Sequence, residues 1–171
     1  LNNLGSGSKA MILDFGKSRE AFRKNFALQE IIEDAALLVR LKLEQSQVDL
    51  HIKEFRENLF VYVDKGQIQQ ALLNLMLNAL VAMPNGGQLT LEAGRAADGK
   101  AQILVSDTGS GIPNELQGQI FDSFLTGTTD GTGLGLSISK RILRAHDGNL
   151  ELLESGQNGT VFKIILPLVA L

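Results

Sequence analysis

Two asparagines, one aspartate and two glycine clusters are the residues of this chain whose types and spacing best suit a phosphorylated ligand with a metal ion. The clusters span residues 107–111 and 131–135, and Asn74 and Asn78 interrupt an apolar stretch upstream of them. Glycine lets backbone amides approach an anion, and a helix N-terminus favours the same charge. An amide oxygen is a hard ligand of the kind that Mg²⁺ accepts. Together these residues predict a site for a nucleotide and magnesium.

Asn74 and Asn78 are the two polar residues of the segment 71–82, and all of its remaining residues are apolar. A buried amide without partners costs about 1–3 kcal/mol, and a spacing of four places both amides on one helical face. Both could instead bond neighbouring backbone groups inside the core. Their pairing upstream of the glycine clusters favours ligand contact. Asn78 is the candidate ligand of Mg²⁺, which takes few protein ligands besides water and phosphate oxygens.

Asp107 ends an expected strand and is followed directly by Thr-Gly. A carboxylate can accept a hydrogen bond from an amino group such as that of adenine, and the adjacent glycines let a ligand approach the backbone. Alone, Asp-Thr-Gly is more often a turn. An aspartic protease would need a second such motif, which the sequence lacks. The context therefore favours a pocket for a base.

The second glycine cluster, Gly131 to Gly135, leads into a helix expected from Leu134 to Ala145. A P-loop needs a preceding strand and an upstream glycine, and Gly16-Lys17-Ser18 has neither. A dinucleotide fingerprint follows a strand early in a βαβ unit, whereas a polar loop, residues 126–132, precedes these glycines. A glycine hinge at a helix N-terminus remains, which suits a triphosphate beneath a closing lid.

The elements expected to position these residues form one mixed sheet covered by helices on one face, an α+β fold. Apolar residues at helical spacing predict helices over 28–43 and 65–83, a helical stretch reaching about Lys24, and a short helix starting at Pro113. Strands are expected over 48–55, 59–63, 89–93 and 102–106, with a closing hairpin over 150–166. We expect His51 and His146 to have structural or solvent roles, and Phe121 and Phe124 to anchor the lid to the core.

Composition limits the class of protein. The 171 residues are 44% hydrophobic and 20% charged, which suits one globular domain with a short extension. A net charge of −3 without a basic run argues against nucleic acid as a partner. Without cysteine there are no disulfides or thiolate metal sites. No apolar stretch is long enough for direct membrane insertion, so we expect a cytoplasmic segment whose parent protein is free to be membrane-anchored.

Four segments resemble, in order, the motifs of sensor histidine kinases. Residues 67–79 resemble the N box, 107–113 the first glycine box, 121–124 the F box and 131–136 the second glycine box. Residues 11–18 are similar to the end of the second helix of the dimerisation and phosphotransfer hairpin. The resemblance divides the chain into a linker or cloning remnant over 1–8, a remnant of that helix over 9–26 and a catalytic ATP-binding domain over 27–171.

The resemblance implies a Bergerat-type two-layer α/β sandwich: a mixed sheet of about five strands, three main helices, a mobile ATP lid and an N-terminal helical extension. The implied cofactors are ATP and Mg²⁺. The implied activity is transfer of the γ-phosphoryl group to a histidine on a dimerisation and phosphotransfer domain of the same parent protein, with a response regulator downstream. Asn78 would ligate Mg²⁺, Asn74 would lie near the phosphates and Asp107 would bind the adenine amino group. The other implied nucleotide-binding residues are Gly109, Gly111, Ile112, Thr126, Thr132, Gly133, Leu134, Gly135 and Leu136.

The chain departs from the family's pattern at three places. The acceptor histidine with its acidic neighbour is absent, so we expect a catalytic half without its acceptor. Thr126 to Thr129 stand where many relatives have a basic residue, and Val81 and Ala82 offer the phosphates no Lys or Tyr. A non-catalytic nucleotide-binding module and a serine kinase of the anti-sigma type therefore stay open as alternatives.

A third alternative is an ATPase of the same superfamily. Hydrolysis needs a group that orients or deprotonates water. In hydrolysing relatives such as gyrase and MutL, a glutamate stands one helical turn before the metal-binding asparagine. This chain has Asn74 there, so phosphoryl transfer is expected in preference to hydrolysis.

Overall fold

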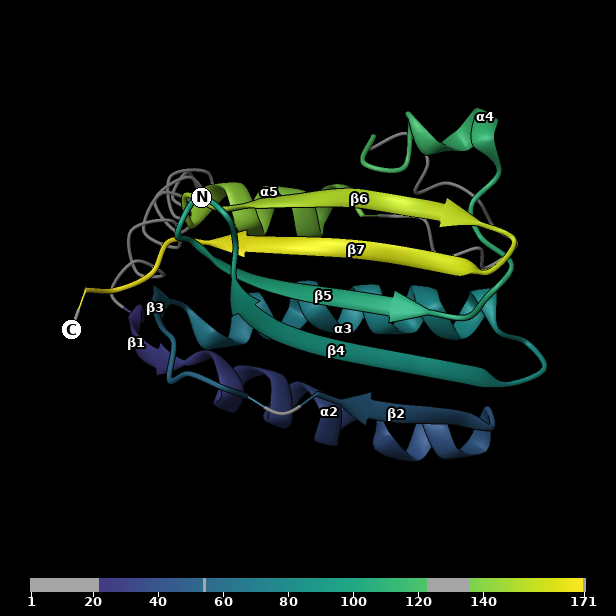
Figure 1. Cartoon of the computed structure of the whole chain (residues 1–171), viewed down its shortest axis with the longest axis horizontal. Helices are drawn as coiled ribbons and strands as arrows, with labels where there is room; N and C mark the ends of the chain where they lie inside the picture. Colours follow the sequence, from purple (N-terminus) through teal and green to yellow (C-terminus); the bar gives the residue numbers. More distant parts are fainter. Residues whose placement is uncertain (1–21, 54, 123–135, 171) are drawn as a thin grey trace, which may run out of the picture.

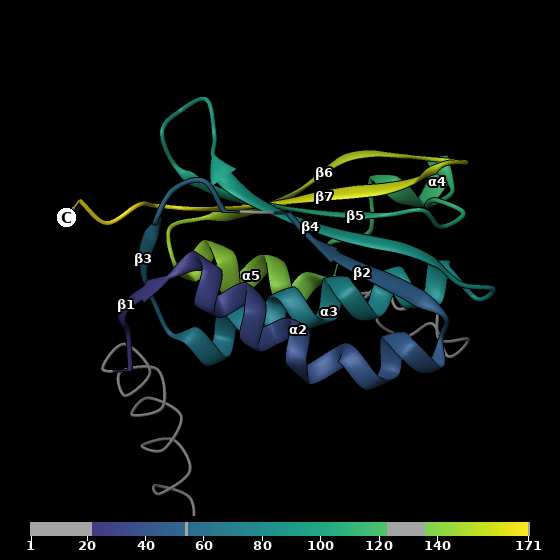
Figure 2. The ribbon, with the colours of Figure 1, turned by 60° about the horizontal axis from the view of Figure 1, so that its bottom comes forward.

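The computed structural model describes residues 22–53, 55–122 and 136–170, which form two layers. One layer is a five-stranded sheet in the order β2-β4-β5-β7-β6 (Figure 1). Figure 2 shows that helices α2, α3 and α5 lie together against one face of this sheet. The strands are β2 (Val48–Ile52), β4 (Gly87–Arg95), β5 (Ala101–Asp107), β6 (Asn149–Gly156) and β7 (Gly159–Leu166). The expected α+β sandwich is confirmed.

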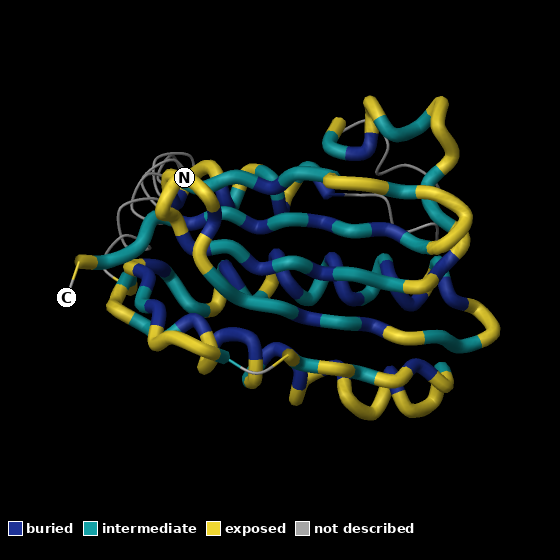
Figure 3. Tube along the Cα trace, in the orientation of Figure 1, coloured by how far each residue is buried: buried dark blue, intermediate teal, exposed yellow. Residues whose placement is uncertain are grey.

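The sheet is mixed, as expected. Strand β2 pairs with β4 in parallel, and the pairs β4–β5, β5–β7 and β6–β7 are antiparallel. Along β7 the residues facing the helices are buried and their neighbours are only partly buried, the period-two pattern of a strand with one covered face. Figure 3 shows this alternation of buried and partly buried stretches along the central strands.

The helices follow the predicted apolar patterns closely. Helix α2 (Leu28–Gln45) buries Ile31, Ile32, Ala35 and Val39 against the sheet, and α3 (Lys65–Ala82) is capped by Asp64, whose carboxylate accepts a hydrogen bond from the Gln67 amide. Helix α4 (Asn114–Gln117) begins one residue after Pro113, which is its N-cap rather than its first residue. Helix α5 is described over Ser137–Ala145, after Leu136 as its N-cap.

The expectation of a helix reaching about Lys24 is wrong at its end. Residues Lys24–Ala27 form strand β1, which pairs antiparallel with β3 (Phe60–Val63) in a separate two-stranded sheet. The amide of Leu28, the first residue of α2, donates to the carbonyl of Leu59 at 2.8 Å. Pairing with a distant strand therefore overrides local helical preference here. The division of the chain into linker, helix remnant and catalytic domain stays a prediction.

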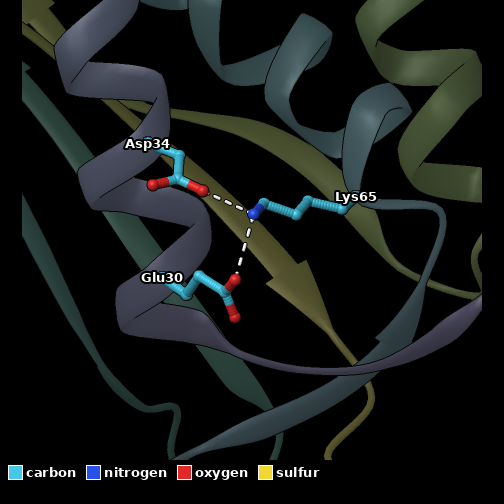
Figure 4. Close-up of polar contacts among 3 residues, drawn as sticks. All are labelled: Glu30, Asp34 and Lys65. Atoms are coloured by element: carbon cyan, nitrogen blue, oxygen red, sulfur yellow. Dashed lines mark hydrogen bonds and ion pairs between the residues drawn. The ribbon is translucent and has the colours of Figure 1, made fainter.

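Lys65, the first residue of α3, joins this helix to the first two turns of α2. Its ammonium group forms ion pairs with Asp34 and with Glu30, the latter at 3.1 Å (Figure 4), and lies 5.5 Å from the centre of the Phe26 ring. The hydrogen bond to Asp34 is the main cause that raises the pKa of Lys65. A cation shared by two carboxylates and a ring thus links the start of α3 to α2 and β1.

His146 has the structural role that was expected. It is buried at the end of α5, where the Nδ1–H group donates to the carbonyl of Ile142 at 2.8 Å, and Nε2 accepts from the backbone amide of Asp64 at 3.2 Å. Burial lowers the pKa of His146. His51 is exposed on β2, also as expected. His146 therefore links the end of α5 to the start of α3.

Within the three described ranges, none of the helices has the length and apolar character needed to cross a membrane.

Candidate nucleotide site

A cavity of about 240 Å³ opens where the end of α3, the end of β5, the segment leading to α4 and the start of β7 meet. Segments far apart in sequence therefore contribute to one site. Its lining residues are Asn78, Val81, Ala82, Asp107, Ser110, Gly111, Ile112, Pro113, Leu116, Thr160 and Phe162.

Asn78 is the polar residue that α3 contributes to the cavity. Its Nδ2 atom is buried and has no hydrogen-bond partner among the described residues. An unmade hydrogen bond at a buried donor costs about 1–3 kcal/mol. Rotation of the amide by 180° exchanges its nitrogen and oxygen, so either atom can serve a ligand. The side chain thus has unused bonding capacity beside an open cavity.

The side chains around Asn78 suit a magnesium ion that is held mainly by water and by the phosphate oxygens of a bound nucleotide. No group of three or more His, Cys, Asp or Glu side chains suited to a metal occurs in the described part of the chain. Mg²⁺ keeps several waters and binds one or two protein oxygens together with substrate phosphates. A single amide oxygen from Asn78 meets that requirement.

Asn74 lies one turn earlier on α3 but does not line the cavity. Its Nδ2 atom donates to the hydroxyl oxygen of Ser139 in α5 at 3.1 Å, and Ser139 is fully buried. The alternative of an amide bonded inside the core therefore applies to Asn74, although the partner is a side chain of another helix. A role of Asn74 near phosphates stays a prediction.

Asp107 ends β5 at the wall of the cavity. Its carboxylate accepts a hydrogen bond from the Gly109 amide at 2.8 Å and a second backbone hydrogen bond from Thr160. Burial is the largest influence and raises the pKa of Asp107, whereas the two backbone hydrogen bonds oppose it. A half-buried acceptor that is held in place by backbone amides is suited to bind an amino group.

Gly109 and Gly111 shape the wall by letting backbones come close. A β-carbon at Gly109 would lie 2.6 Å from the carbonyl oxygen of Ala82, and the Ser110 amide donates to that same oxygen at 3.2 Å. Gly111 has a φ of +83°, and a β-carbon there would collide with the backbone of Gly156. The two glycines therefore bring the loop after β5 against both α3 and the β6–β7 hairpin. Gly111 and Ile112 line the cavity, and Gly109 does not.

Thr160 and Phe162 on β7 were not among the residues predicted from the sequence. Both are buried and line the cavity, and the signal was a threonine at a core-facing position of an alternating strand. Phe121 does pack against the core as expected, edge-to-face with Phe162 at a centroid distance of 6.4 Å.

Several predicted features lie outside the described residues, among them the lid, Phe124 and the segment resembling a phosphotransfer helix. Leu136 is described; it is fully buried and does not line the cavity. The predicted site residues outside the described ranges are Thr126, Thr132, Gly133, Leu134 and Gly135.

Comparison with known proteins defines the class. The sequence pattern of the family described as "Histidine kinase-, DNA gyrase B-, and HSP90-like ATPase" matches residues 63–170. The chain belongs to this family, and within it to the ATP-binding domains of sensor histidine kinases, because its relatives are kinases of that type. The resemblance drawn from the sequence motifs is confirmed.

Two curated relatives illustrate the similarity. The chain is 32% identical over 157 residues to the signal transduction histidine-protein kinase AtoS of Escherichia coli (strain K12), a match covering 92% of this chain and 26% of AtoS. It is 35% identical over 147 residues to sporulation kinase C of Bacillus subtilis (strain 168), covering 85% of this chain and 34% of that kinase. The chain thus spans about a quarter to a third of the length of these relatives.

Solved structures agree. The catalytic domain of histidine kinase ThkA superposes with a TM-score of 0.74 at 33% identity, covering 85% of this chain and 95% of that one. ThkA in complex with the response regulator protein TrrA gives a TM-score of 0.73 at 27% identity, covering 96% of this chain and 49% of that one. The fold is therefore that of a histidine kinase catalytic domain.

Proposed function

We propose that this chain binds Mg²⁺-ATP in the cavity between α3 and β7 and supplies the γ-phosphoryl group to a histidine on a dimerisation and phosphotransfer domain. One observation carries the proposal: Asn78 and Asp107, a candidate metal ligand and a candidate acceptor for an amino group, come from different elements and line the same cavity.

Different residues of the cavity would bind different parts of the nucleotide. The Asp107 carboxylate accepts from the adenine amino group, and Ile112, Leu116 and Phe162 supply the apolar surface that a purine ring needs. The Asn78 amide oxygen holds the metal. When bound there, the metal ion would supply positive charge that offsets the negative charge of the phosphates during transfer.

The neighbourhood of Asn78 favours transfer over hydrolysis. One helical turn before Asn78 stands Asn74, whose amide is bonded to Ser139. An amide cannot remove a proton from water as a carboxylate does. We infer that bound ATP is kept for an acceptor side chain.

Partners and location belong to the same proposal. The complex of the related kinase ThkA with TrrA supports a response regulator as the downstream acceptor. We place the chain in the cytoplasm, where ATP and such regulators are found, next to the histidine-bearing domain of its parent protein.

Calorimetric titration with a non-hydrolysable ATP analogue, with and without Mg²⁺, tests the binding step. Affinity that rises with Mg²⁺ and collapses in Asn78→Ala is expected. A transfer assay with a histidine-bearing hairpin supplied in trans then tests the activity. Tight binding without transfer would instead favour the non-catalytic module, an alternative suggested by the absence of a basic residue at positions 126–129. No binding by the folded chain would overturn the proposal.

A further inference from the structure

A bulge in β6 decides which side chain stands opposite Thr160 of β7. Leu152 pairs with Phe162, but the next register pair is Glu154 with Val161, so one extra residue is accommodated in β6. Ser155 consequently stands opposite Thr160. In an unbulged strand Glu154 would occupy that place, because pairing would advance one residue at a time. The bulge therefore sets a neutral hydroxyl, and not a second carboxylate, opposite Thr160, whose register partner on β5 is Asp107.

The Ser155 hydroxyl connects two walls of the cavity without lining it. Its Oγ atom accepts a hydrogen bond from the Ile112 amide at 2.7 Å and lies 2.8 Å from the Oγ1 atom of Thr160. Ile112 and Thr160 both line the cavity. One atom thus joins the segment after β5 to strand β7.

This bridge offers two arrangements of the Thr160 proton, because either hydroxyl can donate to the other. The Ile112 amide is a donor, so the Ser155 oxygen accepts from it and its own proton is free for Thr160 Oγ1. When Ser155 donates in this way, the Thr160 proton is free to point into the cavity that Thr160 lines. Asp107 and Thr160 are register partners on β5 and β7. The wall then presents an acceptor from Asp107 beside a donor from Thr160.

We propose that Ser155 is a positioning residue that directs the Thr160 hydroxyl toward the ligand and so selects a purine whose ring nitrogen beside the amino group is a hydrogen-bond acceptor. Adenine has this arrangement at its amino group and N1. In inosine or guanine nucleotides N1 carries a proton, so the N1–H donor would face the Thr160 hydroxyl donor and no hydrogen bond would form. The inference rests on the proposed function, because it assumes an adenine nucleotide in this cavity.

The test compares ADP with 1-deaza-ADP, which lacks the N1 acceptor, by calorimetry on the wild-type chain and on Ser155→Ala. Replacing N1 is expected to weaken wild-type binding about three- to tenfold, the value of one net hydrogen bond. In Ser155→Ala, ADP binding weakens by a similar factor and the penalty for 1-deaza-ADP falls below about twofold. The penalty for 7-deaza-ADP, which keeps N1, is expected to be the same in both proteins.

Three further variants keep the result interpretable. Ser155→Thr retains the hydroxyl on a strand and is expected to restore the N1 penalty, and the exposed neighbour Glu154 serves as the control through Glu154→Ala. Thr160→Val removes the hydroxyl that Ser155 directs and is expected to abolish the same penalty if Ser155→Ala fails to fold. An N1 penalty that survives in both Ser155→Ala and Thr160→Val overturns the inference while ADP binding still supports the proposed function. If wild-type protein binds no nucleotide, both are wrong.

Discussion

The ammonium group of Lys140 lies 4.5 Å from the centre of the Phe121 ring. The same group donates a hydrogen bond to the Leu150 carbonyl at 2.8 Å, and the Phe121 ring packs edge-to-face on Phe162. Lys140 therefore ties α5 to β6 and to the segment that follows α4. The ammonium group is partly removed from water, and this burial lowers the pKa of Lys140. A cation–π contact is stronger for a cation that has lost part of its hydration.

We expect Lys140→Met to lower the free energy of unfolding by about 1 kcal/mol, because the contact with the ring and the bond to Leu150 are both lost. Urea denaturation measures the effect. A double-mutant cycle with Phe121→Leu is expected to give a coupling energy of about 0.5–1 kcal/mol. Arg141→Met, at an exposed position of the same helix, is the control. A coupling near zero would mean that the ring contact contributes nothing.

Asn78 and Asn74 are expected to respond in opposite directions to the same substitution. Asn78→Leu removes a buried donor without a described partner, so the free energy of unfolding should rise by about 1 kcal/mol while Mg²⁺-dependent nucleotide binding is lost. Asn74→Leu removes the hydrogen-bond partner of Ser139 and should lower the free energy of unfolding by about 1–2 kcal/mol. Thermal and urea unfolding of the ligand-free variants decide the matter. Destabilisation by both substitutions would show that Asn78 is bonded inside the folded chain.

Asp107 should make stability depend on pH. Burial raises its pKa in the folded chain above the usual 3.8, so the folded state holds the proton more tightly than the unfolded state. Its contribution to stability is fully present below 3.8 and is lost as pH rises through the raised pKa. Relative to Asp107→Asn, the wild-type free energy of unfolding should therefore fall over this window. Asp122→Asn, at an exposed aspartate, should follow the wild type, and parallel curves for wild type and Asp107→Asn would contradict the assignment.

The Asp107→Asn variant also tests the base pocket. An amide in place of the carboxylate is expected to weaken ATP more than GTP, because only adenine places an amino group on Asp107. Competition titrations with both nucleotides measure this selectivity. Equal losses for the two would remove Asp107 from base recognition.

His146 has the opposite pH dependence. Its folded-state pKa is lowered by burial, so its contribution is present above the unfolded value of 6.5 and is lost as pH falls through the folded pKa. Protonation would also take away the Nε2 acceptor of the Asp64 amide at the start of α3. When the free energy of unfolding is measured at decreasing pH, the wild type should lose stability in this range, and His146→Gln should not show that loss. His51→Gln, at an exposed position, should keep the wild-type loss.

The helices and most strands could be predicted because their patterns are local. The apolar spacing of α2 and α3 and the alternation in β7 need no knowledge of the rest of the chain. Strand β1 could not be predicted in this way, because it exists through pairing with β3. The residues Lys24 to Ala27 carry no alternation of their own that would distinguish a strand from the end of a helix.

The site was predictable to the extent that its motifs are contiguous. Asp107, Gly111 and Asn78 line the cavity as the motifs indicate. The partner of Asn74 depends on how α5 packs on α3, and spacing of four residues gives a face but no partner. The bridge through Ser155 depends on a bulge that appears only when β6 is paired with β7. These features belong to tertiary pairing.

Segments near both ends of the described chain contact the same residue, Phe60. Ala27 of β1 is the register partner of Phe60, and the amide of Val169 donates to the Phe60 carbonyl at 2.9 Å. In Figure 1 this corner lies at the opposite end of the sheet from α4 and the turn between β6 and β7. A polypeptide segment attached at either end would therefore act on the same corner of the domain, and a rotation about that corner would displace the far end of the sheet, where the ends of α3 and β5 line the cavity.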